Sequence, residues 1–140
     1  MIYIEEHKDL FSVDTKKYSV AHCISSDCKM GAGIAKPINK KFKLGGLENL
    51  PEDDREHPTC IYHRGVYNLI TKKKYSGKPT YATLRVALVV MRNHAIANNI
   101  THIAMPKIGA GLDKLNWGMV RAIIQELFED TNLEILVCRK

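Results

Sequence analysis

Two short glycine runs each follow an apolar stretch, and they are the segments of this chain best suited to bind an anion. Residues 30–35 (Met-Gly-Ala-Gly-Ile-Ala) follow apolar residues 20–25, and residues 109–113 (Gly-Ala-Gly-Leu-Asp) follow residues 102–106. Each pattern predicts a strand, a turn with exposed backbone and then a helix, which together aim free N–H groups at one point and suit a phosphate. Two such turns indicate a ligand with more than one phosphate; ordinary turn chemistry is the alternative for the glycines.

The charge of the chain also favours anionic partners. The formal net charge is +6 and the pI is near 9.2, which is typical of proteins that meet nucleotides, polyphosphates or nucleic acid. Two interpretations of the basic surface stay open: a solvated, solubilising face, or a footprint for nucleic acid or a nucleotide-modified target. The sequence has neither a zinc finger pattern nor an aromatic strand of the RNA-recognition type. The clustered lysines are Lys36, Lys40, Lys41 and Lys43, and then Lys72, Lys73 and Lys74.

Other common catalytic and metal-binding patterns are missing. Lys36 stands where a dinucleotide fingerprint needs its third glycine, and the chain has no P-loop, no nucleophile elbow and no zinc-protease motif. The four cysteines lack C-x-x-C spacing, so we expect reduced thiols packed as small apolar side chains and neither a metal site nor a disulfide. They are Cys23, Cys28, Cys60 and Cys138.

Length and composition predict one domain over residues 1–140. The chain is 45% apolar and 26% charged, an ordinary globular composition, and its length can bury a core without covalent staples. No apolar run approaches the roughly 18 residues of a membrane span, and acidic residues near the N-terminus are unlike a signal peptide. We expect a soluble intracellular protein, cytoplasmic or, in a eukaryote, nuclear.

The positioning elements alternate between strands and helices. A short turn capped by Asp9 and an irregular loop over residues 45–58 complete the pattern. Pro37 lies inside the first helix as a point of weakness, and Pro79 is expected in the first turn of the second. This alternation predicts an α/β fold with a mixed central sheet sandwiched between helices. Strands are expected at residues 1–4, 18–25, 60–62, 66–70, 100–105 and 133–138, and helices at residues 31–42, 79–98 and 116–128.

Several segments resemble a macro domain, from about residue 3 to the C-terminus. Residues 78–81 (Lys-Pro-Thr-Tyr) and Asp113 are similar, more narrowly, to the terminal ADP-ribose protein glycohydrolase branch. The resemblance implies a macro domain fold with an ADP-ribose cleft at the C-terminal ends of the central strands, where open α/β sheets generally bind ligands. The segments that carry it are residues 22–25, 30–35, 69–72, 78–81 and 105–113.

The same resemblance implies a set of substrate-binding residues. Asp9 and Leu10 would lie at the adenine end with Ser25 nearby, and Lys140 would add a terminal contact. Cys138 replaces an aromatic residue expected near the adenine. The distal ribose would be flanked by Gly31, Gly33 and Ile34, and the diphosphate would be wrapped by the backbone N–H groups of Lys107, Ile108, Gly109, Ala110, Gly111 and Leu112.

Two residues carry the chemistry that the resemblance implies, with no metal and no cofactor. Lys78 would attack the anomeric carbon of the distal ribose and form a covalent adduct; it must lose its proton first, which desolvation or a nearby positive charge favours. Asp113 would move protons and help release the product, so it must reach the ribose directly or through one water. The alternatives are a solvated lysine for Lys78 and a helix cap near Asn116 for Asp113.

The sequence therefore favours an enzyme that removes mono-ADP-ribose from an acceptor. Candidate substrates are ADP-ribosylated glutamate or aspartate, O-acetyl-ADP-ribose and ADP-ribosylated DNA bases. The expected partners are ADP-ribose and ADP-ribosylated protein or DNA, with nucleic acid on the basic face, and the expected state is a monomer. A non-catalytic ADP-ribose reader is the alternative; a phosphatase acting on ADP-ribose 1″-phosphate and a nucleic-acid-binding protein stay open as well.

Overall fold

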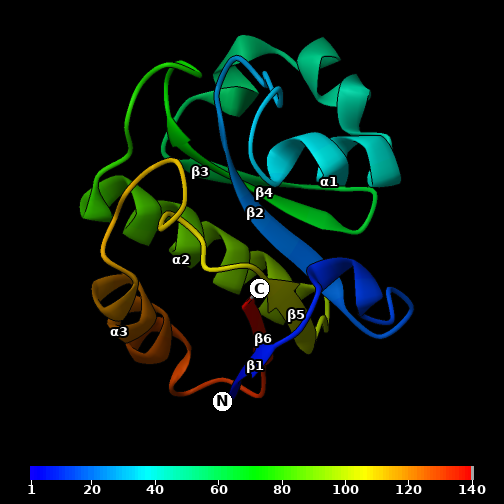
Figure 1. The fold of residues 1–140 in the computed structure, drawn as a ribbon, viewed down its shortest axis with the longest axis vertical. Coiled ribbons are helices and arrows are strands. Elements are labelled where there is room, and N and C mark those ends of the chain that lie inside the picture. Colours follow the sequence, from blue (N-terminus) through cyan, green and yellow to red (C-terminus); the bar gives the residue numbers. More distant parts are fainter. Residues whose placement is uncertain (140) are drawn as a thin grey trace.

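A computed structural model describes residues 1–139 and shows one six-stranded sheet (Figure 1). The strand order is β1-β6-β5-β2-β4-β3. All neighbouring pairs are parallel except the β3–β4 hairpin. The strands are β1 (Ile2–His7), β2 (Ser19–Ser25), β3 (Thr59–His63), β4 (Val66–Lys72), β5 (His102–Met105) and β6 (Glu134–Arg139).

Helices cover both faces of the sheet, and each face has its own apolar cluster. On one face α2 (Tyr81–Ala97) and α3 (Trp117–Phe128) bury Leu88, Ile124 and Phe128 against the strands. On the other face the 3₁₀ helices η1 (Leu10–Ser12) and η2 (Leu44–Asn49), together with α1 (Ala35–Phe42), bury Leu10, Ile38 and Leu47. Figure 1 shows α1 and α2 on opposite sides of the sheet. The predicted mixed sheet between helices is confirmed, and so is the order of its strands and helices.

The first helix starts later than predicted, at Ala35 and not at residue 31. The backbone of Gly33 has φ +59°, a left-handed conformation that cannot continue a right-handed helix. Pro37 is the third residue of α1, where a missing N–H removes no intrahelical hydrogen bond. The proline is therefore accommodated in the first turn of the helix.

The second helix also begins beyond its predicted start. Pro79 precedes the cap residue Thr80, and α2 runs from Tyr81. The Thr80 hydroxyl accepts from the Thr83 backbone N–H, and the Thr83 hydroxyl accepts from the Thr80 N–H, a reciprocal capping box. This cap fixes the end of the loop that carries Lys78.

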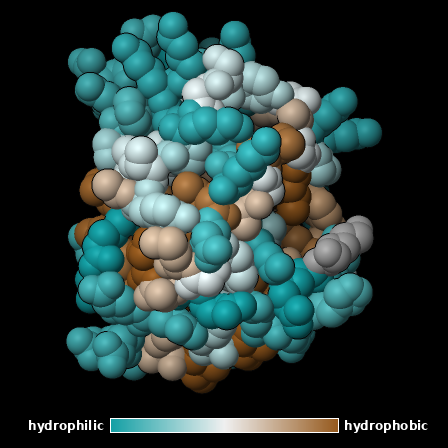
Figure 2. Space-filling model, turned by 60° about the vertical axis from the view of Figure 1, so that its left-hand side comes forward, coloured by the Kyte–Doolittle hydropathy of each residue, from teal (hydrophilic) through white to brown (hydrophobic). Residues whose placement is uncertain are grey.

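The region of residues 45–58, predicted as loop with some irregular helix, contains most of η2 and a further 3₁₀ helix, η3 (Glu52–Arg55). The four cysteines are free thiols; Cys28 and Cys138 are buried, whereas Cys23 and Cys60 are half-buried. In the view of Figure 2 hydrophilic residues cover most of the surface, and hydrophobic residues emerge in small groups. Among the helices of residues 1–139, none has the length and apolarity to cross a membrane.

The topology places both glycine loops at one edge of the sheet. β2 and β5 are parallel neighbours, so their C-terminal ends share that edge. From β2 the chain runs to α1 on one face, and from β5 it runs to α3 on the other. Loops that leave neighbouring strands in opposite directions open a crevice between them, which is where ligands bind in open α/β sheets.

Candidate functional site

Two connected cavities form a cleft along this edge. The first cavity, of about 430 Å³, contains Ser25, Lys72 and Asp113. The second cavity, of about 640 Å³, contains Asp9 and Trp117. Four residues line both cavities and so join them into one cleft: Ile34, Pro106, Lys107 and Gly111.

Most of the predicted site residues line this cleft. Asp9 and Leu10 lie in the second cavity, where Asp9 also caps η1 by accepting from the Phe11 N–H. Asp113 lies in the first cavity. The others divide as follows: Gly33, Ile108, Gly109 and Leu112 line the first cavity, Ala110 lines the second, and Ile34, Lys107 and Gly111 line both.

Three of the predicted residues have a different position from the one expected. Ser25 lines the first cavity with Asp113 and not the second with Asp9, because β2 ends two strands away from β6. Gly31 is not among the residues that line either cavity, although it faces the Tyr75 hydroxyl. Lys78 lines a smaller neighbouring cavity of about 340 Å³. Lys140 lies outside the described residues.

The two glycine loops touch each other across the cleft. A Cβ atom on Gly33 would lie 3.0 Å from Cδ1 of Leu112, and one on Gly109 (φ +72°) would lie 3.0 Å from Cδ1 of Leu115. Both glycines therefore combine left-handed backbone with close packing, which a larger residue would disrupt. Gly33 and Leu112 both line the first cavity.

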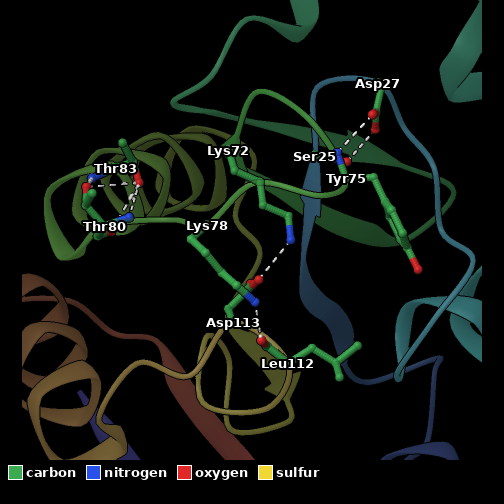
Figure 3. A network of polar contacts seen from close by, with 9 residues as sticks. All are labelled: Ser25, Asp27, Lys72, Tyr75, Lys78, Thr80, Thr83, Leu112 and Asp113. Atoms are coloured by element: carbon green, nitrogen blue, oxygen red, sulfur yellow. Dashed lines mark hydrogen bonds and ion pairs between the residues drawn. The ribbon is translucent and has the colours of Figure 1, made fainter.

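Two lysines reach consecutive residues of the second glycine loop (Figure 3). Lys72 Nζ lies 2.8 Å from Asp113 Oδ1, and these side chains are only 15% and 13% exposed. Lys78 Nζ donates to the Leu112 carbonyl oxygen at 2.8 Å. Asp113 is not the cap of α3, because Asn116 has that role and accepts from the Met119 N–H. The structure thus brings the two predicted catalytic residues to one loop and places Lys72 in contact with one of them, Asp113.

Cys23, which also lines the first cavity, is chemically quiet. Burial raises the pKa of its thiol to about 12, and the nearby Asp113 carboxylate adds to this effect. A thiol rather than a thiolate is therefore present at neutral pH, and a thiol is a poor nucleophile. Among the groups that line the first cavity, the lysines and Asp113 are better placed for chemistry.

A carboxylate ties together the two loops on either side of the first cavity. Asp27 accepts from the Ser25 hydroxyl and the Lys29 N–H on its own loop, and its other oxygen accepts from the Tyr75 N–H at 2.9 Å. Burial opposes ionisation, but these hydrogen bonds outweigh it and lower the pKa of Asp27. Tyr75, anchored in this way to Asp27 (Figure 3), forms part of the wall of the first cavity.

The second cavity is held by a different carboxylate, that of Glu5. Its oxygens accept from Trp117 Nε1, from Arg121 Nε and Nη2, and from the Tyr3 hydroxyl. Burial alone would raise the pKa of Glu5, yet these donors lower it to about 2. Trp117 lines the second cavity with Arg139, whose Nε lies 3.5 Å from Glu5, so Glu5 fixes two walls.

Sequence reasoning did not single out Glu5, Asp27, Lys72, Tyr75 or Trp117 as site residues. For Lys72 a signal was available, since it directly follows the buried strand run of residues 66–71 and parallel strands end at a shared edge. The other four act through contacts between distant segments, which no local motif reveals. Within residues 1–139, no group of three or more His, Cys, Asp or Glu side chains is arranged to hold a metal ion.

Solved structures identify the class of this fold. The macrodomain of DarG from Thermus aquaticus superimposes with a TM-score of 0.86 at 20% identity, covering 99% of both chains. The macrodomain of Mycobacterium tuberculosis DarG gives 0.87 at 17% identity, covering 98% of this chain and 97% of that one. At these identities the likeness concerns the fold, which is that of a macro domain.

Curated relatives define the branch. The chain is 45% identical over 133 residues to human ADP-ribose glycohydrolase OARD1, covering 92% of this chain and 86% of that protein. The Bos taurus protein of the same name is 46% identical over 123 residues, covering 85% of this chain and 80% of that protein. No family model matches the sequence. The chain therefore belongs to the ADP-ribose glycohydrolase branch of the macro domains and is an enzyme of the hydrolase class, as the sequence resemblance implied.

Proposed function

We propose that this protein hydrolyses the bond between the distal ribose of ADP-ribose and an acceptor, with Lys78 as nucleophile and Asp113 as acid and base. The observation that carries the proposal is the meeting of both residues at one loop although 34 residues separate them. Lys78 Nζ lies 2.8 Å from the carbonyl oxygen of Leu112, and Asp113 is the next residue.

The cleft suits a dinucleotide-sized anion. A diphosphate at the junction of the cavities would face the second glycine loop, where Gly111 N–H and Leu112 N–H have no acceptor among the described residues. Lys107 adds a positive charge beside this junction. The adenine would then occupy the second cavity, and the distal ribose would lie in the first. Support comes from the DarTG protein of Thermosipho africanus, solved in complex with ADP-ribose; it superimposes with a TM-score of 0.78 at 13% identity, covering 94% of this chain and 39% of that one.

The reaction proceeds in two displacements. The neutral amine of Lys78 forms a C–N bond to the anomeric carbon while the bond to the acceptor breaks and the acceptor keeps the electron pair. Asp113 accepts the proton of the resulting ammonium and passes it to the departing acceptor. It then accepts a proton from water, whose oxygen displaces Lys78 from the sugar, and returns that proton to the lysine nitrogen.

The acceptors that we propose are groups that leave readily from the anomeric carbon. Carboxylates of glutamate or aspartate, the acetyl ester of O-acetyl-ADP-ribose and DNA bases are the candidates, so the activity includes deacylation. Exposed Lys73 and Lys74 line the cavity beside Lys78 with His57 and present a basic surface to an anionic acceptor such as nucleic acid. We propose that residues 1–140 act as one domain and as a monomer.

The test compares the wild type with Lys78→Ala on three substrates: an ADP-ribosylated glutamate peptide, O-acetyl-ADP-ribose and ADP-ribosylated DNA. Lys78→Ala should abolish turnover of every substrate that the wild type cleaves and leave the Kd for ADP-ribose within a few-fold. Lys16→Ala, an exposed lysine that lines neither cavity, is the matched control.

The outcomes separate the alternatives. Full activity of Lys78→Ala would discard the lysine mechanism. Tight ADP-ribose binding by a wild type that cleaves none of the three substrates would indicate a reader, and phosphate release from ADP-ribose 1″-phosphate would indicate a phosphatase.

A further inference from the structure

The Lys72–Asp113 ion pair is the most enclosed charged contact in the cleft. Its two atoms lie 2.8 Å apart, and both side chains are nearly nine-tenths covered. Among the described residues, the ion pair of Asp113 is with Lys72 alone. An ion pair so shielded from water is stronger than one at the surface, because the effective dielectric constant is lower.

A second amine lies one residue away. Lys78 Nζ donates to the carbonyl oxygen of Leu112, the residue before Asp113. Figure 3 shows both lysine side chains converging on the Leu112–Asp113 segment from β4 and from the loop that follows it. Asp113 thus has two lysines nearby, and of these only Lys72 forms an ion pair with it.

The consequence for chemistry follows from the need for a neutral amine. A carboxylate paired with Lys78 would stabilise the ammonium form, which has no lone pair to attack the sugar. A carboxylate paired with Lys72 leaves Lys78 outside the ion pair. The same contact holds Asp113 at the wall of the first cavity, where the ribose would lie.

We propose that Lys72 is a positioning residue: it holds Asp113 in the first cavity and prevents this carboxylate from pairing with Lys78. The inference rests on the proposed function, because it assigns Lys72 a role toward the two residues that perform the reaction. Lys72 forms no bond to the substrate in this scheme. Its role is to keep Asp113 from forming an ion pair with the ammonium form of Lys78 before the amine attacks the sugar.

The experiment measures formation of the Lys78 adduct, separately from its release, in five variants. Intact-mass spectrometry after rapid quenching quantifies the covalent ADP-ribosyl adduct on the protein. The variants are Lys72→Met, Asp113→Asn, the double variant with both changes, and Lys16→Met as the matched loss of one surface charge. Lys72→Arg is added because arginine retains the charge and pairs well with carboxylates.

Each variant has a distinct expected result. Lys72→Met should slow adduct formation at least about 30-fold. With a glutamate-linked substrate, whose carboxylate departs without a proton, Asp113→Asn should form the adduct but retain it. The double variant should regain adduct formation to within about threefold of Asp113→Asn, because the uncharged amide cannot form an ion pair with Lys78. Lys72→Arg should recover most of the wild-type rate, and Lys16→Met should not differ from the wild type.

Rescue by Asp113→Asn shows that the defect of Lys72→Met acts through the Asp113 carboxylate. Because the same change also removes an unpaired buried charge, the rates are compared at a temperature where circular dichroism shows every variant folded, so that a loss of folded protein is not read as a loss of positioning. Wild-type adduct formation in Lys72→Met, or a double variant as slow as Lys72→Met, would overturn the proposal. A crystal structure of Lys72→Met gives a readout that needs no turnover: Asp113 should lie within about 4 Å of Lys78 Nζ, and an unmoved carboxylate would overturn the proposal. If the proposed function itself fails, Asp113→Asn forms no adduct and Lys78→Ala stays active, a pattern that no defect confined to Lys72 produces.

Discussion

The two ends of the cleft are held together in different ways. At the end that contains the first cavity, charged side chains face the ligand space: Lys72 and Asp113 both line it, and Lys78 reaches its edge. At the other end five large apolar side chains, those of Leu10, Phe11, Pro37, Leu115 and Trp117, line the second cavity beside the charged Lys8, Asp9 and Arg139, and the carboxylate of Glu5 lies behind the wall; we call it the apolar end after these five side chains.

This difference assigns separate duties to the two ends. Charged groups inside a cavity can act on a reacting bond, whereas apolar walls bind a ligand mainly by removing its surface from water. Changes at the charged end should therefore lower kcat with little effect on affinity. Changes at the apolar end should raise KM with little effect on kcat.

After the loss of turnover expected for Lys78→Ala, the largest effect is expected at the charged end, from Asp113→Asn. Loss of an acid/base group costs about 10²–10⁴-fold in rate, so kcat should fall by that amount while the Kd for ADP-ribose changes within about threefold. Steady-state kinetics and calorimetry check the two quantities. Asp53→Asn, an exposed aspartate on η3, serves as control; an equal loss of affinity in Asp113→Asn would assign the residue to binding instead.

Two buried or half-buried titratable groups near the two ends, His22 on β2 and Glu5 on β1, should make the free energy of unfolding depend on pH in different ranges. His22 of β2 is fully buried, with Nε2 2.6 Å from Asn68 Oδ1 on β4. Burial lowers its pKa from 6.5 to about 4. The native state thus binds fewer protons than the unfolded state between these values, and the free energy of unfolding should fall as pH drops from 6.5 toward 4.

Because of His22, the free energy of unfolding should be about 2 kcal/mol lower at pH 5 than at pH 7. This value follows from the ordinary histidine pKa of 6.5 and the native pKa of about 4. Glu5, below the other end, has its pKa lowered to about 2 and should lose its contribution only below about pH 4.5. Urea unfolding of the wild type and of His22→Gln at pH 7 and pH 5 tests the sign. An equal loss of stability in both proteins would mean that other groups control the acid response.

A smaller effect is expected from Asp27→Ala, which unties the loop of Lys78 from the first glycine loop. The Tyr75 N–H would lose its acceptor, and Lys78 would sample more positions, so kcat should fall by about tenfold because misplacement of a reacting group slows the reaction. Asp54→Ala on η3 is the control. A change confined to KM would contradict the role of Asp27 in holding the charged end.

The smallest effect is expected at the apolar end, from Glu5→Gln. The amide cannot hold Arg121 and Trp117 as strongly as a carboxylate does, so the walls of the second cavity should loosen and affinity for ADP-ribose should fall by about fivefold. The kcat should change within twofold. Glu126→Gln removes an exposed ion pair with Arg85 as control; a large fall in kcat in Glu5→Gln would erase the distinction between the two ends.

The sequence could predict those parts of the site that are encoded by a few consecutive residues. Residues 30–35 and 109–113 carry their turn chemistry in consecutive glycines, and both loops line or flank the cleft as expected. The helix over residues 116–128 and the paired strands near residues 60–62 and 66–70 also have local signals, and all three elements were predicted. The predicted start of α1 was too early because the sequence does not reveal whether a glycine such as Gly33 adopts a left-handed or a helical backbone conformation.

The sequence by itself determined the alternation of strands and helices, the two glycine loops and, through its resemblance to a known family, the branch of macro domains. These features depend on neighbouring residues and on hydrophobic periodicity. Only the tertiary structure decided that Lys72 holds Asp113, that Asp27 joins two loops and that Ser25 lies at the charged end of the cleft. The two side-chain contacts join segments 41 and 48 residues apart in the chain, and the physical reason they exist is the order of strands in the sheet, which places chain-distant strand ends side by side.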